Sequence, residues 1–254
     1  MMYLEYNLSK DVVAFSTQRG GSGGNYDKFN ITDYCGDSEE HVAMCRAELL
    51  KKLTIEDDKL ILPRQTHQTN ILSIDKKFLS LEKDDRKEKL YAIDSVVTNL
   101  KNVCIGVSTA DCIPILLLDK ENMVVAAIHA GWRGTVNHIV EKTIKYLQSE
   151  YLTNPQNIAA VICPGIGEDA FEVGDEVYDA FHNEGFDINK ISKRYEKWHI
   201  NLKRANKIEL ENCGVKEENI YDCEICTYTN FKDYFSARRL GINSGRIFNG
   251  IMIK

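Results

Sequence analysis

The chain has 254 residues, of which 43% are hydrophobic and 28% are charged, so it is long enough to bury a sizeable core and has the composition of an ordinary globular protein. Its formal net charge at pH 7 is -6. This balance excludes a global basic field that would attract nucleic acid or an anionic membrane surface. An anionic substrate would therefore have to be bound by a local cluster of arginines.

The first residues and the cysteines indicate a cytoplasmic protein. Residues 1–7 lack the basic and apolar regions of a signal peptide, and the chain has no run of about 18 apolar residues that would span a bilayer. Its eight cysteines are expected to be free thiols, because disulfides are rare in the cytosol. We therefore predict a cytoplasmic location and no membrane partner.

The first quarter of the chain combines strand and helix patterns. Residues 12–16 are typical of a strand, and a glycine-rich loop follows at 18–24. This loop lacks the Lys-Ser/Thr ending of a phosphate-binding P-loop, so we interpret it as a flexible loop. Residues 39–53 place apolar side chains at helical spacing between charges, which predicts an amphipathic helix. Short strands are expected at 60–63 and 71–74.

The middle of the chain is expected to form strands and a hairpin. Residues 76–89 are dense in charge and predict a solvated loop or helix face. Strands at 92–98 and 103–107 are expected to lead into the hairpin. Two apolar runs, 113–118 and 124–128, flank a polar turn, which is the pattern of antiparallel pairing.

Strands and helices also alternate in the second half. The patterns predict helices at 134–151, 175–181 and 201–213, the last closed by Gly214, and strands at 158–163 and 247–253. No repeat and no linker rich in Pro or Ser interrupts the chain. We therefore predict a single mixed α/β domain covering residues 1–254.

The hairpin brings two reactive residues together. If Leu118 pairs with Met123, the same register places Cys112 directly opposite His129. Directly opposed residues have Cβ atoms roughly 4.5 to 5.5 Å apart, close enough for sulfur and imidazole to share one metal ion or one proton. The small residues that follow His129, including Gly131, would let a ligand approach closely.

Two chemistries remain open for this pair. As nucleophile and base, Cys112 and His129 would make a cysteine hydrolase or transferase, with Asp111 or another group orienting the imidazole. As metal ligands they need a third partner and an open position for water, the pattern of catalytic zinc. His67, which lies in a polar connector, is the best candidate for the third ligand.

A second pattern imitates a different metal site. His182-Asn-Glu184, followed by Cys223 and Cys226, resembles parts of the zinc-dependent nucleobase deaminases. The proline before the first cysteine is missing, and His182 lies where a helix is expected to end. We therefore interpret the two cysteines as core thiols.

Several motifs together resemble the YfiH-type laccase-domain family, also called the multicopper polyphenol oxidase or purine nucleoside phosphorylase family. The most specific pair is Ala-Asp-Cys, ending at Cys112, and His-Ala-Gly-Trp-Arg-Gly, beginning at His129. The resemblance runs from about residue 15 to 253, and its other motifs lie at 64–68, 164–167, 171–177 and 235–239, with Arg246.

The resemblance implies a layered α/β sandwich of mixed sheets flanked by helices, similar to the catalytic domain of cytotoxic necrotising factor. It implies that His67, Cys112 and His129 hold Zn²⁺. It also implies phosphorolysis of adenosine, inosine and methylthioadenosine, together with deamination of adenosine. The expected partners are purine nucleosides and phosphate, with no nucleic acid.

Further roles follow from charge type and motif position. Arg46 and Arg133 are candidates for binding phosphate, and Gln65 for binding substrate. Asp111, Glu172 and Asp94 are candidates for moving a proton. The sequence departs from the family pattern at three places, where Cys45 precedes Arg46, Tyr34-Cys-Gly-Asp37 replaces His-Val-Gly-Asp, and Cys163 replaces a glycine. We therefore expect substrate binding to differ in detail.

Two other activities are attached to the same family. A copper-dependent polyphenol oxidase is one, since one Cys and two His can also bind copper. Against it, the six histidines include no His-x-His pair, which leaves too few imidazoles for a trinuclear oxygen-reducing cluster. The other is a peptidoglycan editing factor, for which a Cys112 nucleophile would suit the hydrolysis.

Overall fold

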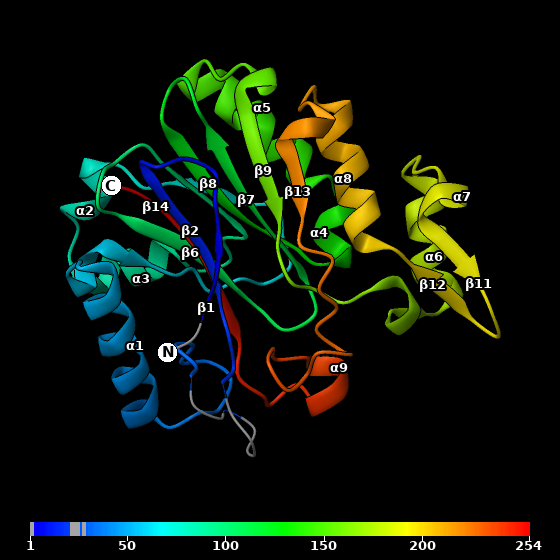
Figure 1. The fold of residues 1–254 in the computed structure, drawn as a ribbon, viewed down its shortest axis with the longest axis horizontal. Helices are drawn as coiled ribbons and strands as arrows, with labels where there is room; N and C mark the ends of the chain where they lie inside the picture. The colour runs from blue at the N-terminus through cyan, green and yellow to red at the C-terminus, as the bar shows by residue number, and fades with distance from the viewer. Residues whose placement is uncertain (1–2, 21–25, 27–28) are drawn as a thin grey trace.

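The computed structural model describes residues 3–20, 26 and 29–254, whose strands form three sheets. The first sheet is mostly antiparallel and joins the two ends of the described chain (Figure 1). In spatial order it contains β1 (Tyr3–Tyr6), β2 (Val12–Thr17), β14 (Ile247–Ile253), β6 (Cys104–Thr109) and β3 (Leu60–Ile61). Only the pairing of β3 with β6 is parallel among these strands.

The second sheet is mixed and lies at the centre of the molecule. In spatial order it contains β13 (Ile220–Asp222), β9 (Ile158–Ile162), β7 (Ile113–Asp119), β8 (Val124–Ala130), β5 (Ser95–Thr98) and β4 (Ile71–Ser73). Every residue of β7 and β8 is buried. A strand buried on both faces is covered by another layer on each side.

The alternation of side chains along β7 shows what these two layers are. Leu116 and Leu118 pack with residues of the first sheet such as Val107 and Ile251. The intervening residues, represented by Ile115, face the opposite way and pack against helices. Because successive side chains of a strand point to opposite faces, one apolar run contributes to both cores.

Helices complete the outer layers (Figure 1). The helical cover of the second sheet comes from α4 (Trp132–Val136), α5 (Ile139–Tyr151) and α8 (Leu202–Asn212). On the outer face of the first sheet, α1 (Glu39–Leu53) packs Cys45 and Leu49 against β2 and β14. The order of layers is therefore helix, sheet, sheet, helix.

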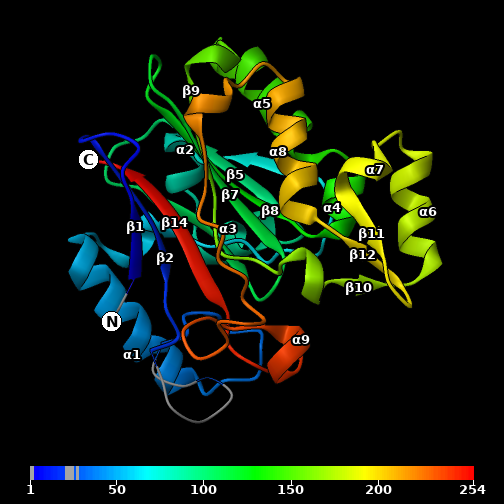
Figure 2. The same ribbon diagram turned by 45° about the vertical axis from the view of Figure 1, so that its right-hand side comes forward.

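A smaller third sheet extends from one side of this body (Figure 2). It contains β10 (Glu172–Val173), β12 (Trp198–Ile200) and β11 (Ser192–Arg194), and α6 (Asp175–Asn183) and α7 (Ile188–Ile191) pack beside it.

The remaining short helices are α2 (Lys76–Leu79), α3 (Lys83–Lys89), α9 (Ala237–Leu240), η1 (Asp57–Lys59), η2 (Pro155–Asn157), η3 (Glu168–Ala170) and η4 (Glu217–Asn219). Within the described residues, no helix is long and apolar enough to cross a bilayer.

The mixed α/β class predicted from the sequence is confirmed, but one predicted helix is wrong. Instead of a single helix at 134–151, the chain forms α4 and α5 with a break at Asn137 and His138. His138 has φ 57°, a left-handed conformation that a right-handed helix cannot continue. Of the glycine-rich loop predicted at 18–24, residues 21–24 lie outside the described residues.

The predicted register of the central hairpin is also wrong. Asp119 pairs with Val124, and Pro114 rather than Cys112 lies opposite His129. The turn is therefore displaced by one residue along the chain, so that β7 ends at Asp119 and β8 begins at Val124. The displacement keeps Cys112 on the face of His129, because Cys112 lies two residues from Pro114 and side chains repeat every second residue.

Candidate metal centre

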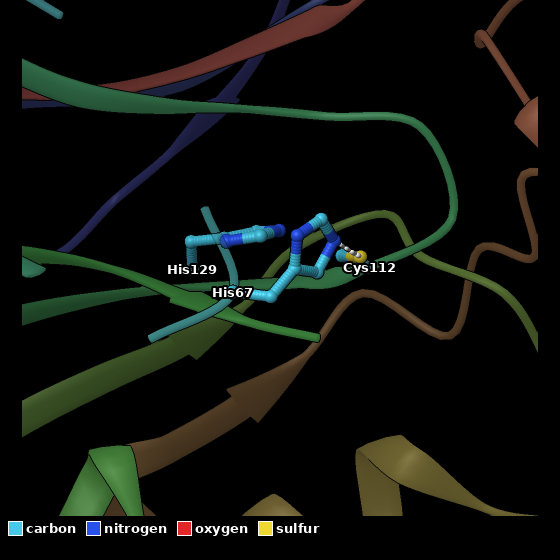
Figure 3. Close-up of side chains that lie close together, drawn as sticks. All are labelled: His67, Cys112 and His129. Atoms are coloured by element: carbon cyan, nitrogen blue, oxygen red, sulfur yellow. Dashed lines mark hydrogen bonds between the residues drawn. The ribbon is translucent and has the colours of Figure 1, made fainter. Parts of the chain in front are cut away.

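Three side chains from distant parts of the chain converge beside the central hairpin (Figure 3). His67 lies in the connection between β3 and β4, Cys112 in the turn before β7, and His129 near the end of β8. One ligand atom from each residue lies within 4.8 Å of the other two. The structure thus brings together the three residues that the sequence assigned to the metal.

The spacing of these side chains fits one ion. The Sγ atom of Cys112 lies 3.8 Å from Nε2 of His67, and the rings of His67 and His129 are 4.9 Å apart at 70° between their planes. Zinc–sulfur and zinc–nitrogen bond lengths place two ligands of a tetrahedral ion roughly 3.5 Å apart. Small side-chain rotations would therefore close the cluster on a metal.

A buried carboxylate holds both histidines. Asp94 is completely buried, and its Oδ1 accepts a hydrogen bond from Nδ1 of His129 at 2.7 Å. The same carboxylate accepts the backbone N–H groups of Thr66, His67 and Gln68 at 3.2, 3.0 and 2.9 Å. Because a carboxylate only accepts, Nδ1 of His129 carries the proton and Nε2 is left for a ligand.

The electrostatics favour a thiolate at Cys112. Burial raises the pKa of this thiol, but the charge and hydrogen bond of His129, followed by those of His67, outweigh burial and lower the pKa to about 6. Burial lowers the pKa of His129, but Cys112 and Asp94 outweigh it and raise this pKa to about 9. A thiolate is the form of cysteine that binds metals and acts as a nucleophile.

Gly131 leaves room for the cluster. A Cβ atom at this position would lie 3.0 Å from Sγ of Cys112 and 3.0 Å from Cδ2 of His67. Any larger residue would displace a ligand, so the glycine is needed for the approach of these two side chains. This agrees with the role predicted for the small residues after His129.

Asp111 shapes the turn that carries Cys112. Its Oδ1 accepts a hydrogen bond from the hydroxyl of Thr227, and its Oδ2 accepts one from the backbone N–H of Arg238, both at 2.7 Å. The residue has φ 90°, a strained conformation for a side chain with a Cβ atom. Both oxygens are therefore used to hold the turn against two distant loops.

Glu172 lies on an exposed part of β10. Its carboxylate pairs with Lys197 at 2.8 Å, and the hydrogen bond from Lys197 lowers its pKa. The backbone carbonyl of Glu172 accepts two hydrogen bonds from the guanidinium of Arg238 at 3.1 Å. These contacts favour a charged carboxylate, and its role in proton transfer stays a prediction.

Gln65 joins the segment before His67 to β6. Its Nε2 donates to the backbone carbonyl of Ser108 at 2.7 Å, and its Oε1 accepts the backbone N–H of the same residue at 3.1 Å. The amide thus pairs with Ser108 much as a neighbouring strand would. Its predicted contact with substrate is not tested by these bonds.

The two candidate phosphate-binding arginines have different surroundings. Arg133 lies on α4, four residues after His129 in sequence, and its guanidinium lies 4.3 Å from the ring centre of Trp132. Arg46 lies on α1 and pairs with Asp57 at 3.0 Å. The structure thus gives Arg133 an aromatic partner and Arg46 an acidic one, and the binding of phosphate by either arginine stays a prediction.

The second cysteine pattern does not form a comparable cluster. Among the described residues, the triad is the single group of three His, Cys, Asp or Glu side chains with metal-binding spacing. The thiol of Cys226 instead accepts the backbone N–H of Gly167 at 3.1 Å, and Cys223 lies 3.8 Å from Nζ of Lys203. Both cysteines are thus outside a metal cluster, but they are half-buried rather than the core thiols that the sequence predicted.

The sequence did not reveal how Asp94 holds His129 and the backbone of residues 66–68; we call this set of hydrogen bonds the Asp94 clamp. Asp94 was a candidate for moving a proton, whereas its contacts make it a positioning residue for His129 and for the loop of His67. No local pattern indicates this role, because the hydrogen-bonded groups of His129 and Asp94 are 35 residues apart. An acidic residue directly before a buried strand was the available signal.

The sequence matches a known protein family and named relatives along most of its length. The family described as multi-copper polyphenol oxidoreductase laccase matches residues 12–254. The chain is 44% identical to the purine nucleoside phosphorylase of Bacteroides thetaiotaomicron over 94% of this chain and 90% of that protein. It is 42% identical to adenosine deaminase RL5 from an unknown prokaryotic organism, over 96% and 94% of the two chains.

Solved structures agree with the sequence relatives. The crystal structure of YlmD from Geobacillus stearothermophilus superimposes with a TM-score of 0.90 at 25% identity, covering 100% of this chain and 97% of that one. The structure of a Bacillus licheniformis protein called YfiH gives a TM-score of 0.86 at 25% identity, covering 96% and 93%. The layered arrangement is therefore shared along nearly the whole chain.

Proposed function

Because the chain belongs to the multi-copper polyphenol oxidoreductase laccase family, and relatives above 40% identity are named for purine nucleoside chemistry, we propose that it is a zinc-dependent purine nucleoside phosphorylase. Its proposed substrates are phosphate with adenosine, inosine and methylthioadenosine, and it is proposed to deaminate adenosine as well. The convergence of His67, Cys112 and His129 within 4.8 Å is the observation that carries this proposal.

The donor set suits Zn²⁺. His67, Cys112 and His129 would be its three protein ligands, and His67 is exposed to solvent. When bound, zinc supplies Lewis acidity and lowers the pKa of a coordinated water toward about 7. One thiolate and two neutral imidazoles leave a single positive charge at the centre, which favours an anionic substrate such as phosphate.

The residues around the triad have distinct proposed tasks. Asp94 fixes the proton on Nδ1 of His129, so that Nε2 points to the ligand position. Arg133, four residues after His129 in sequence, is proposed to bind phosphate, with Arg46 as the second phosphate-binding candidate and Gln65 contacting substrate. Proton transfer at the nucleoside is assigned to Glu172 or Asp111.

Two other activities have less support. A multicopper oxidase needs further imidazole clusters, and within the described part of the chain the triad is the single cluster of metal-binding type. The lowered pKa of Cys112 favours a second candidate, a cysteine hydrolase such as a peptidoglycan editing enzyme. In that case the Cys112 thiolate would be the nucleophile and no metal would be required.

Metal content and phosphorolysis test the proposal together. Elemental mass spectrometry on untagged protein should give about one zinc per chain, and hypoxanthine release from inosine should require phosphate. Chelation should abolish the activity, and added zinc should restore it. Stoichiometric copper with oxygen consumption on phenols would overturn the proposal in favour of the oxidase.

Cysteine variants separate the metal enzyme from the hydrolase. Cys112→Ala should lose both zinc and activity, whereas Cys213→Ala, which removes a half-buried thiol elsewhere, should keep both. A metal-free protein whose activity resists chelation but depends on Cys112 would contradict the zinc proposal and support the hydrolase.

We also propose a cytoplasmic location, supported by eight free cysteines.

A further inference from the structure

A cavity separate from the candidate metal centre lies between the helices that cover the central sheet. Its volume is about 380 Å³, within the size range of small-molecule sites. It is lined by His138 and Glu141 at the start of α5, by residues 185–187, 190 and 191 before and within α7, and by the last turns of α8 with Cys213. The cavity shares no residue with the triad or with the candidate substrate-binding residues.

Glu209 is the unusual group in this cavity. It is 5% exposed, and its Oε1 accepts a hydrogen bond from Nδ1 of His138 at 2.5 Å. Its Oε2 is buried and has no hydrogen-bond donor among the residues that the structure describes. A buried carboxylate oxygen without a donor is expected to find one in a ligand or in water.

The other charges near Glu209 are of both signs. Glu141 and Asp187 line the cavity, and Glu184 lies 3.9 Å from Nε2 of His138. Lys145 pairs with Glu141 and Lys190 pairs with Asp187, while Lys142 donates to Thr69 at 3.2 Å. The buried Oε2 of Glu209 stays without a donor in these surroundings.

The remaining lining is apolar and aromatic. Phe186, Ile191 and Ile208 form part of the wall. The ring of His138 is stacked on Phe186, with centroids 5.1 Å apart and planes 4° from parallel. A ligand with an apolar body and a hydrogen-bond donor at one end matches this combination of surfaces.

We propose that this cavity binds a small organic cation, a primary ammonium or guanidinium group on an apolar body, which donates a hydrogen bond to Oε2 of Glu209. The buried carboxylate of Glu209 selects the cationic end. Phe186 and the two isoleucines contact the body. A metal ion is not the occupant that this chemistry fits, because among the described residues no three potential ligands have metal-binding spacing at this cavity.

The ionisation of Glu209 gives the binding a signature. Burial raises the pKa of this carboxyl to about 7, against the opposing contribution of His138. A cation stabilises the charged carboxylate and lowers its pKa, so binding below pH 7 releases a proton. The affinity for a cation should therefore rise between pH 6 and pH 8, whereas the affinity for a neutral ligand should not.

Phenethylamine and its neutral analogue 2-phenylethanol are suitable probes for calorimetry on the full chain. The amine should bind at least tenfold more tightly than the alcohol at pH 8. Its apparent binding enthalpy at pH 6 should depend on the ionisation enthalpy of the buffer, which reports the released proton. Equal affinities for amine and alcohol, or binding of neither, would overturn the proposal.

Variants test the contact itself. Glu209→Gln should weaken amine binding at least tenfold and remove the pH dependence, provided that its circular dichroism and melting temperature show a folded protein. Glu217→Gln, which changes an exposed glutamate paired with Lys207, is the matched control and should bind as the unchanged chain does. If Glu209→Gln fails to fold, the buffer dependence of the unchanged chain decides the proposal without a variant.

Discussion

Two histidine–carboxylate pairs in this chain look alike but differ in how the carboxylate is held. Nδ1 of His129 lies 2.7 Å from Asp94, and Nδ1 of His138 lies 2.5 Å from Glu209. Both carboxylates are nearly or fully buried. Asp94 also accepts three backbone N–H groups, whereas Oε2 of Glu209 has no donor among the described residues.

The pKa values of the two carboxyls differ accordingly. Burial raises the pKa of each, but the hydrogen bond and charge of His129 and the backbone N–H groups lower that of Asp94 below its usual range. At Glu209 burial prevails, and the pKa rises to about 7. A histidine lowers the pKa of both carboxyls, but Asp94 is lowered further by backbone N–H groups, whereas Glu209 has the charge of Glu141 nearby, which raises its pKa.

The largest effect is expected from Asp94→Ala. This change leaves three backbone N–H groups and the imidazole of His129 without their acceptor, so the free energy of unfolding should fall by about 3 to 5 kcal/mol. Zinc affinity should fall by about 10- to 100-fold because His129 loses its orientation. Chemical denaturation and metal competition measure the two effects.

Asp94→Asn is the milder partner of that variant. It keeps the size of the side chain and one carbonyl oxygen, so it should retain more stability than Asp94→Ala. If Asp94→Ala lost less than about 1 kcal/mol, a typical single hydrogen bond, the clamp would not have the importance that its contacts indicate.

The next effect is a pH dependence of stability that comes from Glu209. Its pKa is raised from 4.5 to about 7 in the folded chain, so between these values the folded state binds more protons than the unfolded state. This contribution is fully present below pH 4.5 and is lost as pH rises to 7, with a limit of about 3 kcal/mol.

Denaturant titrations from pH 4.5 to 8 measure this loss. Glu209→Gln removes the titrating group and should flatten the curve relative to the unchanged chain, whereas Glu217→Gln should leave the curve as it is. The opposite result would be a free energy of unfolding that rises from pH 4.5 to 7 in the unchanged chain but not in Glu209→Gln. It would show that Glu209 is held in its charged form, as Asp94 is.

The smallest effects are expected from two glycines, one beside each pair. Gly131→Ala places a Cβ atom 3.0 Å from two triad side chains, so zinc affinity should fall by roughly tenfold, with a stability cost of about 1 kcal/mol from overpacking. Gly185→Ala is the control, because its Cβ atom would have no neighbour within 4 Å, although its φ of 82° strains an alanine.

The control should lose about 1 kcal/mol of stability from backbone strain and no zinc affinity. Competition with a zinc chelator measures the affinities, and thermal unfolding measures the stabilities. Equal zinc affinities for the two variants would mean that the triad tolerates displacement and is not closely packed around its ion.

Local patterns predicted the elements whose formation depends on nearby residues. The helix Glu39–Leu53 and the strand Ile247–Ile253 have the predicted bounds, because an amphipathic period and a continuous apolar run each specify one conformation. The predicted hairpin register and the predicted single helix at 134–151 were wrong. Both depend on backbone conformations at single residues. The single domain and the likeness to cytotoxic necrotising factor stay predictions.

The sequence by itself determined the mixed α/β class, the resemblance to the family and the three residues of the candidate metal centre, because these rest on residue identity and on short motifs around each residue. The tertiary structure alone decided how Asp94 is used and why Glu209 differs from it. The hydrogen bonds at issue join groups 35 and 71 residues apart. Packing brings such groups together. It places three backbone N–H donors around Asp94 and leaves Oε2 of Glu209 without a donor among the described residues, so that this oxygen is free to accept one from a ligand.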